Sequence, residues 1–346
     1  MAENATPIAV STGVDGTKMY GIGAYRPERV VDNEEICQHI DSSDEWIQER
    51  SGIKTRRFAD REESVVHMGT VAAQKALDNS GVDPELVDAI IFCTSTYETI
   101  IPHGAPIIAN NIGRNGIAAF DLTAGCAGFG YGLAVATNVI RGGAARYVLV
   151  IGSERLSEAI NPEDRGTAFI FGDGAGAVVV GPADENELGP VVWGSDGEKG
   201  QAIRQTKNWY QVMDEAVSPE SAEHPWLVMD GSKVFRWAAF TVAKVAQQTL
   251  EAANVGPENI QAFIPHQANG RINDALAKHL GLPDTVAVAN DIEATGNTSA
   301  ASIPLAMETM LREGEAKEGD TALLIGFGAG LSYAGQVVKL PKAPQS

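Results

Sequence analysis

One cysteine, set among glycines, offers the chain a nucleophile. Cys126 lies within Gly125-Cys-Ala-Gly-Phe129, and the apolar run 127–141 that follows is typical of a buried helix. At a helix N-terminus, free N–H groups and the helix dipole lower the pKa of a thiol, and a thiolate attacks acyl carbon readily. A free cysteine is as often a buried structural residue, so Cys126 alone does not establish a site.

Two more polar residues lie where a strand ends or a helix begins. His266 follows an apolar run in Ile264-Pro-His-Gln-Ala-Asn269, and Asn297 lies in Gly296-Asn-Thr-Ser299. A neutral imidazole donates or accepts a hydrogen bond near pH 7, and a carboxamide does both. Each residue also has an ordinary explanation, as a loop histidine with a partner and as a helix N-cap.

The elements that must position these residues repeat along the chain. Residues 245–266 match 72–93 with eight identities in 22 positions, and 321–326 match 147–152. The offsets of these two matches are 173 and 174 residues. Collinear matches at nearly one offset indicate two copies of one α/β unit, each with a helix, a proline-containing turn and an apolar strand.

The repeat predicts that the candidate residues converge. We place the two halves at 1–186 and 187–346, so that Cys126 corresponds to Asn297, each after a glycine where a strand turns into a helix. His266 lies at the carboxyl end of a strand in the second half, where sites form in α/β sheets. A pseudo-two-fold axis would therefore bring Cys126, His266 and Asn297 to one place.

The same pattern predicts the layers around that place. Alternating strands and helices favour largely parallel sheets covered by helices. Small apolar residues dominate 127–141 and the start of 298–311. We therefore expect two equivalent central helices, packed together between two sheets.

Composition excludes several classes of protein. The formal charge of −19 and the pI near 4.7 argue against a nucleic-acid binder. No apolar run approaches a membrane span and no signal peptide is recognisable, so a cytoplasmic protein is expected. Three cysteines without close Cys or His spacing predict neither a disulfide framework nor a structural metal site.

The flanking motifs resemble those of the type III β-ketoacyl-[acyl-carrier-protein] synthases of the thiolase-like superfamily. The resemblance extends from about residue 20 to residue 340. The matching motifs are Ser43-Asp-Glu-Trp-Ile47, Arg50-Ser-Gly-Ile53, Gly125-Cys-Ala-Gly-Phe129, Asp164-Arg-Gly-Thr167, Phe171-Gly-Asp-Gly-Ala-Gly176, Pro265-His-Gln-Ala-Asn269 and Gly296-Asn-Thr-Ser-Ala300.

This resemblance implies a fold and a reaction. The fold is α/β, a duplicated αβαβα arrangement of five layers with two pseudo-two-fold-related halves. Cys126 would take an acyl group from acyl-CoA. His266 and Asn297 would then stabilise the enolate-like charge that forms as malonyl-acyl-carrier-protein loses CO₂, and the product is 3-oxoacyl-acyl-carrier-protein. The reaction implies no metal and no cofactor, and the enzyme would act as a homodimer.

The resemblance also implies binding roles for further residues. The adenine of CoA would lie between Trp46 and Arg165, and Ile101 would close the acyl pocket of a partner subunit. The implied oxyanion donors are the N–H groups of Cys126 and Ala329. The implied CoA contacts are Ser42, Trp46, Arg50, Arg165 and Asn269. The implied carrier-protein contacts are Gln267, Ala268, Asn269, Gly270, Arg271, Arg236 and Lys278. The acyl pocket would include Ile101 and Phe327.

The glycine cluster 326–330 is where the chain departs from the family pattern. A turn that presents N–H groups to an oxyanion explains this cluster better than a dinucleotide site does, because no βαβ unit follows it. The family commonly has glycine where this chain has Ala329, and a positive φ at an alanine is strained. Ser42 stands where threonine is common and keeps the hydroxyl.

Other functions fit part of the pattern. Within the superfamily, the alternative is a condensing or acyl-transfer enzyme of polyketide-type metabolism. Outside it, papain-like hydrolases also order Cys, His and Asn along the chain, but Cys126 is far from the N-terminus and lacks their local motif. A homologue without activity, acting as a scaffold, is disfavoured because all three residues are present.

Overall fold

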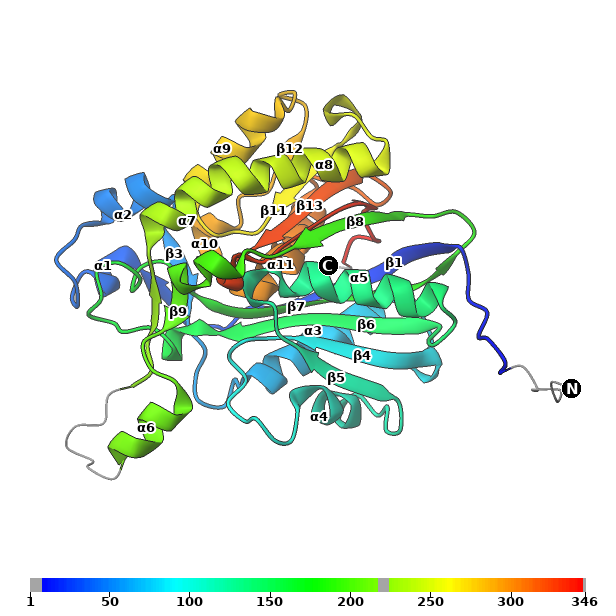
Figure 1. The fold of residues 1–346 in the computed structure, drawn as a ribbon, viewed down its shortest axis with the longest axis horizontal. Helices are drawn as coiled ribbons and strands as arrows, with labels where there is room; N and C mark the ends of the chain where they lie inside the picture. Colours follow the sequence, from blue (N-terminus) through cyan, green and yellow to red (C-terminus); the bar gives the residue numbers. More distant parts are fainter. Residues whose placement is uncertain (1–7, 217–223, 345–346) are drawn as a thin grey trace, which may run out of the picture.

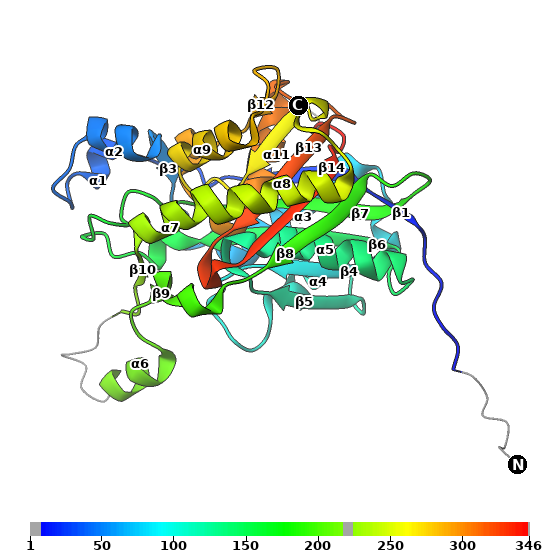
Figure 2. The ribbon, with the colours of Figure 1, turned by 45° about the horizontal axis from the view of Figure 1, so that its top comes forward.

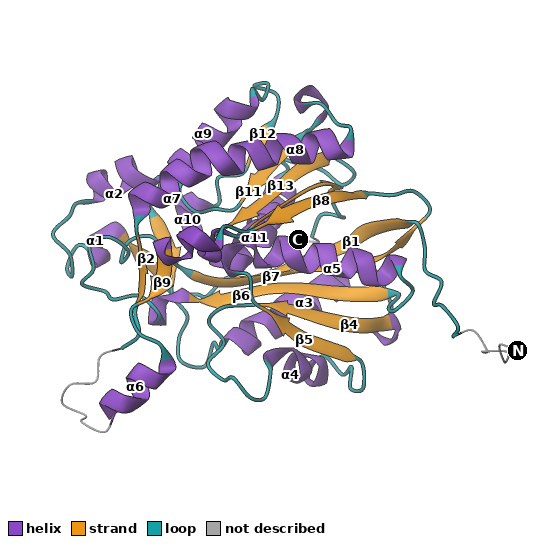
Figure 3. Cartoon of the chain, in the orientation of Figure 1, coloured by secondary structure: helices purple, strands orange, loops and turns teal. Residues whose placement is uncertain are grey.

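Two five-stranded sheets form the frame of the protein (Figures 1 and 3). The computed structural model describes residues 8–216 and 224–344. The first sheet has the strand order β1-β7-β6-β4-β5, and the second has the order β8-β14-β13-β11-β12. The strands of the first sheet are β1 (Gly16–Tyr25), β4 (Val87–Cys93), β5 (Ala118–Leu122), β6 (Tyr147–Arg155) and β7 (Asp173–Ala183). Those of the second are β8 (Leu188–Gly194), β11 (Ala262–Pro265), β12 (Ala287–Val288), β13 (Thr321–Phe327) and β14 (Tyr333–Lys339).

Helices cover the outer faces of the sheets and fill the space between them. Figure 2 shows α8 lying across the outer face of the second sheet. The outer helices are α3 (Val65–Ser80) and α4 (Gly104–Asn111) on the first sheet, and α8 (Ala243–Ala253) and α9 (Gly270–Leu280) on the second. The central helices are α5 (Gly128–Arg141) and α11 (Ser302–Glu313). The five layers confirm the thiolase-like arrangement.

Shorter elements surround the open end of the central layer. Two of them are two-stranded sheets, formed by β2 with β3 and by β9 with β10. The short strands are β2 (Val30–Asp32), β3 (Thr55–Arg57), β9 (Ile203–Gln205) and β10 (Leu227–Met229). The short helices are α1 (Asn33–Ile36), α2 (Asp44–Ser51), α6 (Trp209–Ala216), α7 (Gly231–Trp237) and α10 (Ile292–Thr295).

Sequence repetition and structural repetition coincide. Each half runs from an outer helix (α3 or α8) through a proline turn into the strand at the centre of its parallel pairings (β4 or β11). Gly81 ends α3 with φ +68°, and Asn254 ends α8 with φ +54°, so a left-handed residue stops each helix. The duplication and the equivalence of α5 and α11 are thereby confirmed. The exact boundary between residues 186 and 187 stays a prediction.

The expectation of largely parallel sheets was wrong for half of the pairings. In the first sheet, β4 pairs in parallel with β5 and β6, while β7 pairs antiparallel with both β6 and β1. The second sheet repeats this pattern. The reason is local: no α-helix lies between β6 and β7 in the described residues 156–172, so the chain turns back beside the strand it has left.

The centre of the molecule is a single apolar layer shared by both halves. In β4, Ala89, Ile91 and Cys93 face this layer, while Ile90 and Phe92 face the helices outside. The central layer also receives side chains from α5 and α11, which are buried along most of their length. Burial on both faces explains why the strands read as continuous apolar runs.

The described residues hold no helix long and apolar enough to cross a membrane. Over the same ranges, no group of three or more His, Cys, Asp or Glu side chains is placed to hold a metal ion.

The contact between the halves is tight enough to test. A Cβ added at Gly152 of β6 would lie 2.4 Å from the carbonyl oxygen of Ala300, which precedes α11. We predict that Gly152→Ala lowers the free energy of unfolding by about 1–3 kcal/mol, because neither backbone can retreat without repacking the centre. Urea unfolding measures the change.

Gly197→Ala is the matched control, since a Cβ there would meet nothing within 4 Å. It should stay within about 0.5 kcal/mol of wild type, as surface substitutions usually do. An equally small effect of Gly152→Ala would show that the halves are not in rigid contact.

Candidate active site

Cys126, His266 and Asn297 line one cavity of about 930 Å³. Cys126 comes from the turn before α5, His266 from the end of β11, and Asn297 from the turn before α11. The pseudo-symmetry of the fold thus brings the three side chains to the same cavity, as the repeat predicts. Other residues around it include Trp46, Arg50, Ser95, Thr96, Phe235, Arg236, Ala268, Asn269, Arg271, Ser299, Phe327, Gly328 and Ala329.

The sulfur of Cys126 lies among backbone donors. It receives hydrogen bonds from the N–H groups of Cys126 and Ala329, and it is also hydrogen-bonded to the Ser299 side chain. Gly328 makes the approach possible, because a Cβ there would lie 2.7 Å from the Cβ of Cys126 and 2.9 Å from its sulfur. Two N–H groups from different halves therefore converge on one atom.

The charge state of Cys126 differs from the sequence expectation. Burial raises the pKa of the Cys126 thiol to about 12, although hydrogen bonds from Ser299 and the two N–H groups act in the opposite direction. Desolvation of a thiolate outweighs the helix terminus here. The expected low-pKa thiolate was wrong, and the free protein holds a thiol at neutral pH.

His266 is almost fully buried, with an exposed fraction of 1%. Burial lowers the pKa of its imidazole to about 3, so the ring is neutral at pH 7. Its Nδ1 lies 2.6 Å from the Ser302 Oγ, which also accepts a hydrogen bond from the N–H of Gln267. The Ser302 proton is then free to point at Nδ1, which leaves the Nε2–H of His266 as a donor. The Phe327 ring packs edge-on against the imidazole, with centroids 5.2 Å apart.

Hydrogen bonds fix both the backbone N–H and the backbone carbonyl of Asn297. Its N–H donates to the carbonyl of Ile170 (2.8 Å), and its carbonyl accepts from Gly172 (3.0 Å). The side-chain Oδ1 accepts from the N–H of Ser299 at 2.8 Å. With Oδ1 engaged, the Nδ2 group is the part of the amide that is available to a ligand in the cavity.

The turn that contains Ala329 is not strained at that residue. Positive φ values occur at its neighbours Gly330 (72°) and Leu331 (45°), and Ala329 is not among the described residues with positive φ. The expected cost of alanine at this position was therefore wrong. The N–H of Ala329 reaches the sulfur of Cys126 from an ordinary backbone conformation.

Two guanidinium groups lie close to the ring of Trp46, which lines the cavity together with Arg50. The Cζ of Arg165 is 4.7 Å from the Trp46 ring centroid, and that of Arg50 is 5.6 Å away. Arg165 is thus close to the Trp46 ring, but it is not among the residues that line the cavity. The buried Ser42 Oγ has no partner in the described structure and is not part of the cavity wall.

The segment after His266 divides into buried and exposed residues. Gln267 is fully buried and accepts hydrogen bonds from Asn273 and the N–H of Ile292, so it cannot touch a carrier protein. That assignment was wrong, because the side chain supports the loop from inside. Asn269 caps α9 and donates to the carbonyl of Arg50 at 3.0 Å.

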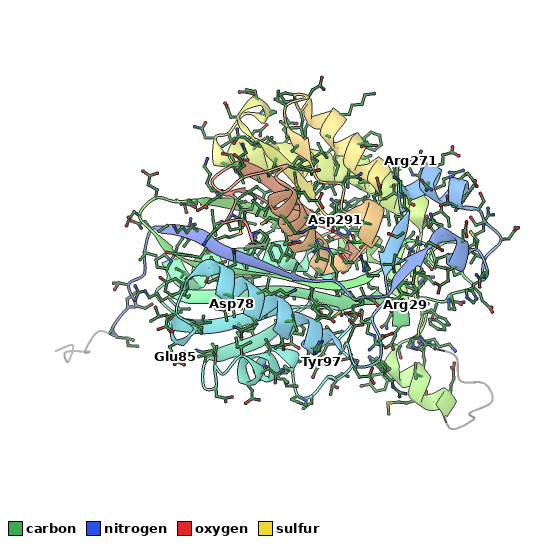
Figure 4. All side chains as sticks on the ribbon, turned by 180° about the vertical axis from the view of Figure 1, so that it is seen from behind. Arg29, Asp78, Glu85, Tyr97, Arg271 and Asp291 are labelled. Atoms are coloured by element: carbon green, nitrogen blue, oxygen red, sulfur yellow. The ribbon has the colours of Figure 1, made fainter. Side chains whose placement is uncertain are left out.

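Arg271 and Arg236 are exposed on adjoining elements near the mouth. The Arg271 guanidinium lies 5.7 Å from the Phe235 ring centroid, and Figure 4 shows Arg271 at the surface beside α2. Ala268 and Gly270 are partly exposed, and Ala268 lines the cavity. Lys278 is exposed on α9 but lies outside the cavity wall.

The two residues expected in the acyl pocket differ in burial. Phe327 is buried and lines the cavity beside His266. Ile101 is 79% exposed and does not line the cavity of its own chain.

Sequence reasoning missed the side chains that support the three candidates. Ser302 holds the His266 ring, and Ser299 bonds both Cys126 and the buried carboxylate of Glu154. The signals were present: Ser299 belongs to the Asn297 motif, Ser302 follows it by two residues, and Glu154 is a charge at the end of an apolar strand. A charged residue in such a strand indicates a buried polar network.

Comparison with known proteins agrees with this geometry. Residues 120–197 match the profile of 3-oxoacyl-[acyl-carrier-protein] synthase III, and residues 250–340 match the profile of its C-terminal part. The chain is 56% identical to the β-ketoacyl-[acyl-carrier-protein] synthase III of Mycobacteroides abscessus, over 98% of this chain and 99% of that one. The chain belongs to the β-ketoacyl-[acyl-carrier-protein] synthase III family.

Solved structures support the same membership in this synthase III family. The 3-oxoacyl-[acyl-carrier-protein] synthase III of Aquifex aeolicus is 38% identical, with a TM-score of 0.86 over 94% of this chain and all of that one. The priming β-ketosynthase of a polyketide biosynthetic pathway is 44% identical, with a TM-score of 0.93 over 97% and 99% of the two chains. The chain is therefore an acyltransferase of the condensing type, and the papain-like alternative was wrong because the fold is thiolase-like.

The neutral imidazole predicts how stability changes with pH. The unfolded chain protonates His266 near its ordinary pKa of 6.5, while the folded protein does so only near 3. As pH falls from 7 to 5, His266 is protonated in the unfolded chain but stays neutral in the folded protein. Wild type should therefore lose about 2 kcal/mol of unfolding free energy relative to His266→Gln.

Urea unfolding at pH 7, 6 and 5 measures this difference, and His39→Gln serves as the control for removing an exposed imidazole. Parallel curves for wild type and His266→Gln would show that the folded protein protonates His266 as readily as the unfolded chain does.

Proposed function

We propose that this protein starts fatty acid synthesis by condensing an acyl-CoA starter with malonyl-acyl-carrier-protein through an acyl-Cys126 intermediate. The observation that carries the proposal is the meeting of Cys126, His266 and Asn297, from two halves of the chain, in one cavity that reaches the surface beside Trp46 and Arg50. A cytoplasmic location follows from the same proposal and stays a prediction.

The first half-reaction uses the two N–H groups around the sulfur. Cys126 attacks the thioester carbonyl, and the carbonyl oxygen becomes an oxyanion near the N–H groups of Cys126 and Ala329. Such donors act strongly in a site without water, because they are already oriented. CoA then leaves with the electron pair of the broken C–S bond.

The second half-reaction uses donors that carry no charge. When malonyl-acyl-carrier-protein loses CO₂, the electron pair of the broken C–C bond moves to the thioester oxygen. The Nε2–H of His266 and the Nδ2 of Asn297 can donate hydrogen bonds to that oxygen. The enolate carbon attacks the acyl-Cys126 carbonyl, and collapse of the intermediate releases the Cys126 thiolate. No step requires His266 to accept a proton, which suits its low pKa.

The mouth of the cavity suits ligands with phosphates. Trp46 offers an aromatic face, and Arg50 and Arg165 stand beside it. Arg271 and Arg236 form a basic edge on an otherwise acidic protein, which fits an acidic carrier protein. We assign Ala268, Asn269 and Gly270 to the same edge, with Lys278 at its periphery, and leave Gln267 out of it.

The edge of the first sheet supports a homodimer. Strand β5 is an edge strand, and Phe120 on it is 38% exposed. In the loop between β4 and α4, Ile100 and Ile101 are 74% and 79% exposed. An exposed edge with apolar neighbours favours pairing with a second copy. In that assembly Ile101 would reach the partner's acyl pocket, since it does not line its own.

The likeness to a priming β-ketosynthase of polyketide synthesis supports a second candidate, a related condensing enzyme of specialised metabolism. The two candidates share the chemistry at Cys126 and differ in the starter and the carrier protein. Profiling with acetyl-, isobutyryl- and longer acyl-CoAs, each with a fatty-acid and a polyketide carrier protein, separates them.

Acylation tests the proposal directly. Incubation with acyl-CoA should add one acyl group to wild type at Cys126 and none to Cys126→Ala, as seen by intact-mass and peptide mass spectrometry. Asn297→Ala should still be acylated but should lose about 10²–10³-fold in condensation with malonyl-acyl-carrier-protein, because an oxyanion donor is missing. An adduct on another residue, or none with any acyl-CoA, would refute the proposed function.

Charge reversal tests the basic edge. We expect Arg271→Glu to raise the KM for malonyl-acyl-carrier-protein at least about tenfold, since a rim charge acts on association. Acylation by acyl-CoA should stay within about twofold of wild type. Lys317→Glu, an exposed change outside the cavity wall, is the matched control. Equal losses in both half-reactions of Arg271→Glu would contradict a role in carrier binding.

A further inference from the structure

A buried carboxylate stands behind the nucleophile. Glu154, the penultimate residue of β6, has no exposed surface, and its burial raises the pKa of the carboxyl group. The mechanism above does not use it. A buried carboxylate is costly unless hydrogen bonds compensate for the lost water, so its partners show what the site is built to hold.

The two carboxyl oxygens of Glu154 accept different numbers of hydrogen bonds. Oε2 accepts three hydrogen bonds, from the Thr96 hydroxyl (2.6 Å), the N–H of Ser95 (3.0 Å) and the Thr94 hydroxyl (3.2 Å). Oε1 accepts one, from the Ser299 hydroxyl at 2.9 Å. Oε2 is therefore saturated, and Oε1 keeps a lone pair that can take a proton.

The threonine protons cannot point elsewhere. The Thr94 oxygen accepts from the N–H of Thr96 (3.2 Å), and the Thr96 oxygen accepts from the N–H of Arg155 (2.9 Å). With their oxygens engaged by donors, both hydroxyl groups direct their protons at Glu154. This fixed set of donors fits an ionised carboxylate in the resting protein.

Ser299 connects Glu154 to the sulfur. Its hydroxyl donates to Glu154, and the same side chain is hydrogen-bonded to Cys126. Ser299 adopts φ +48°, a left-handed conformation that non-glycine residues rarely take. Strained backbone at a buried serine between two titratable groups indicates that the position of this hydroxyl matters.

The charges around Cys126 explain why a nearby proton acceptor is needed. A thiolate formed by losing its proton to solvent would place a second buried anion beside Glu154. Burial raises the pKa of both Cys126 and Cys93, and the charge of Glu154 raises each of them further. The neutral His266 supplies no compensating cation. Moving the proton from Cys126 to Glu154 instead keeps one negative charge in the site throughout.

We propose that Glu154 receives the Cys126 proton through Ser299 when the thiol attacks the acyl thioester. The S–H bond of Cys126 breaks and its proton goes to the Ser299 Oγ, while the original Ser299 proton goes to Oε1 of Glu154. The products are a thiolate, an unchanged serine and a neutral carboxylic acid. Glu154 acts through Ser299 and does not touch the substrate, so it is a positioning residue for the proton.

The pH dependence of alkylation tests this proposal without any acyl-CoA. If Cys126 and Glu154 share one proton, the fraction present as thiolate does not change with pH while the pair keeps that proton. The rate of Cys126 carbamidomethylation by iodoacetamide should then vary less than about twofold between pH 6 and 8. In Glu154→Gln the rate should rise about tenfold per pH unit, because the proton must go to solvent.

Ser299→Ala should show the same steep rise of the Cys126 alkylation rate with pH as Glu154→Gln. If Glu154→Gln does not fold, Ser299→Ala alone tests the proton transfer. Glu308→Gln, which removes another buried carboxylate that pairs with Arg26, is the matched control and should keep the flat profile. Site-resolved mass spectrometry separates Cys126 from the partly exposed Cys37.

Two outcomes would overturn the proposal. A tenfold rise per pH unit in wild type would show that Glu154 holds no proton from Cys126. A faster reaction of Glu154→Gln with an unchanged slope would show that Glu154 acts only as a repelling charge. The inference rests on the proposed role of Cys126, but the two tests are separable. A flat alkylation profile in a protein that acyl-CoA does not acylate would refute the proposed function and leave the proton transfer standing.

Discussion

Backbone packed directly against backbone at the centre of the molecule is the constraint on which the rest depends. The two halves approach so closely that a methyl group at Gly152 would overlap the carbonyl of Ala300, and one at Gly328 would overlap Cys126. This contact joins the turns before α5 and α11 to the strands beside them. The same contact places an N–H of the second half on the sulfur of the first, so the packing of the halves and the construction of the site are one feature.

Close packing also removes water, and the loss of water sets the charges. Cys126 and His266 are held as a thiol and a neutral imidazole rather than as an ion pair. The proposed function would benefit from this, since a neutral His266 would donate a hydrogen bond to an enolate without first losing a proton. Behind the cavity lies the buried carboxyl group of Glu154, whose oxygens accept four hydrogen bonds.

Much of this architecture was predictable because the chain is duplicated. Matching segments at one offset located the strands β4 and β11 and the turns that contain Cys126 and Asn297, and the convergence of the candidates followed from symmetry. Strand direction was less predictable: β7 and β14 return antiparallel because no α-helix joins them to the preceding strands β6 and β13. Gln267 was misassigned because its motif position says nothing about which way its side chain points.

The sequence by itself determined the fold, the family and the identity of the three cavity residues, since repeats and motifs are properties of residue order. Only the tertiary structure decided their protonation and their hydrogen-bond partners. A pKa depends on the water and dipoles within a few ångströms, and here those come from distant segments: Ser299 meets Cys126 and Glu154 only after the halves have packed. The helix terminus visible in the sequence favoured a thiolate, and the burial that the sequence does not show outweighed it.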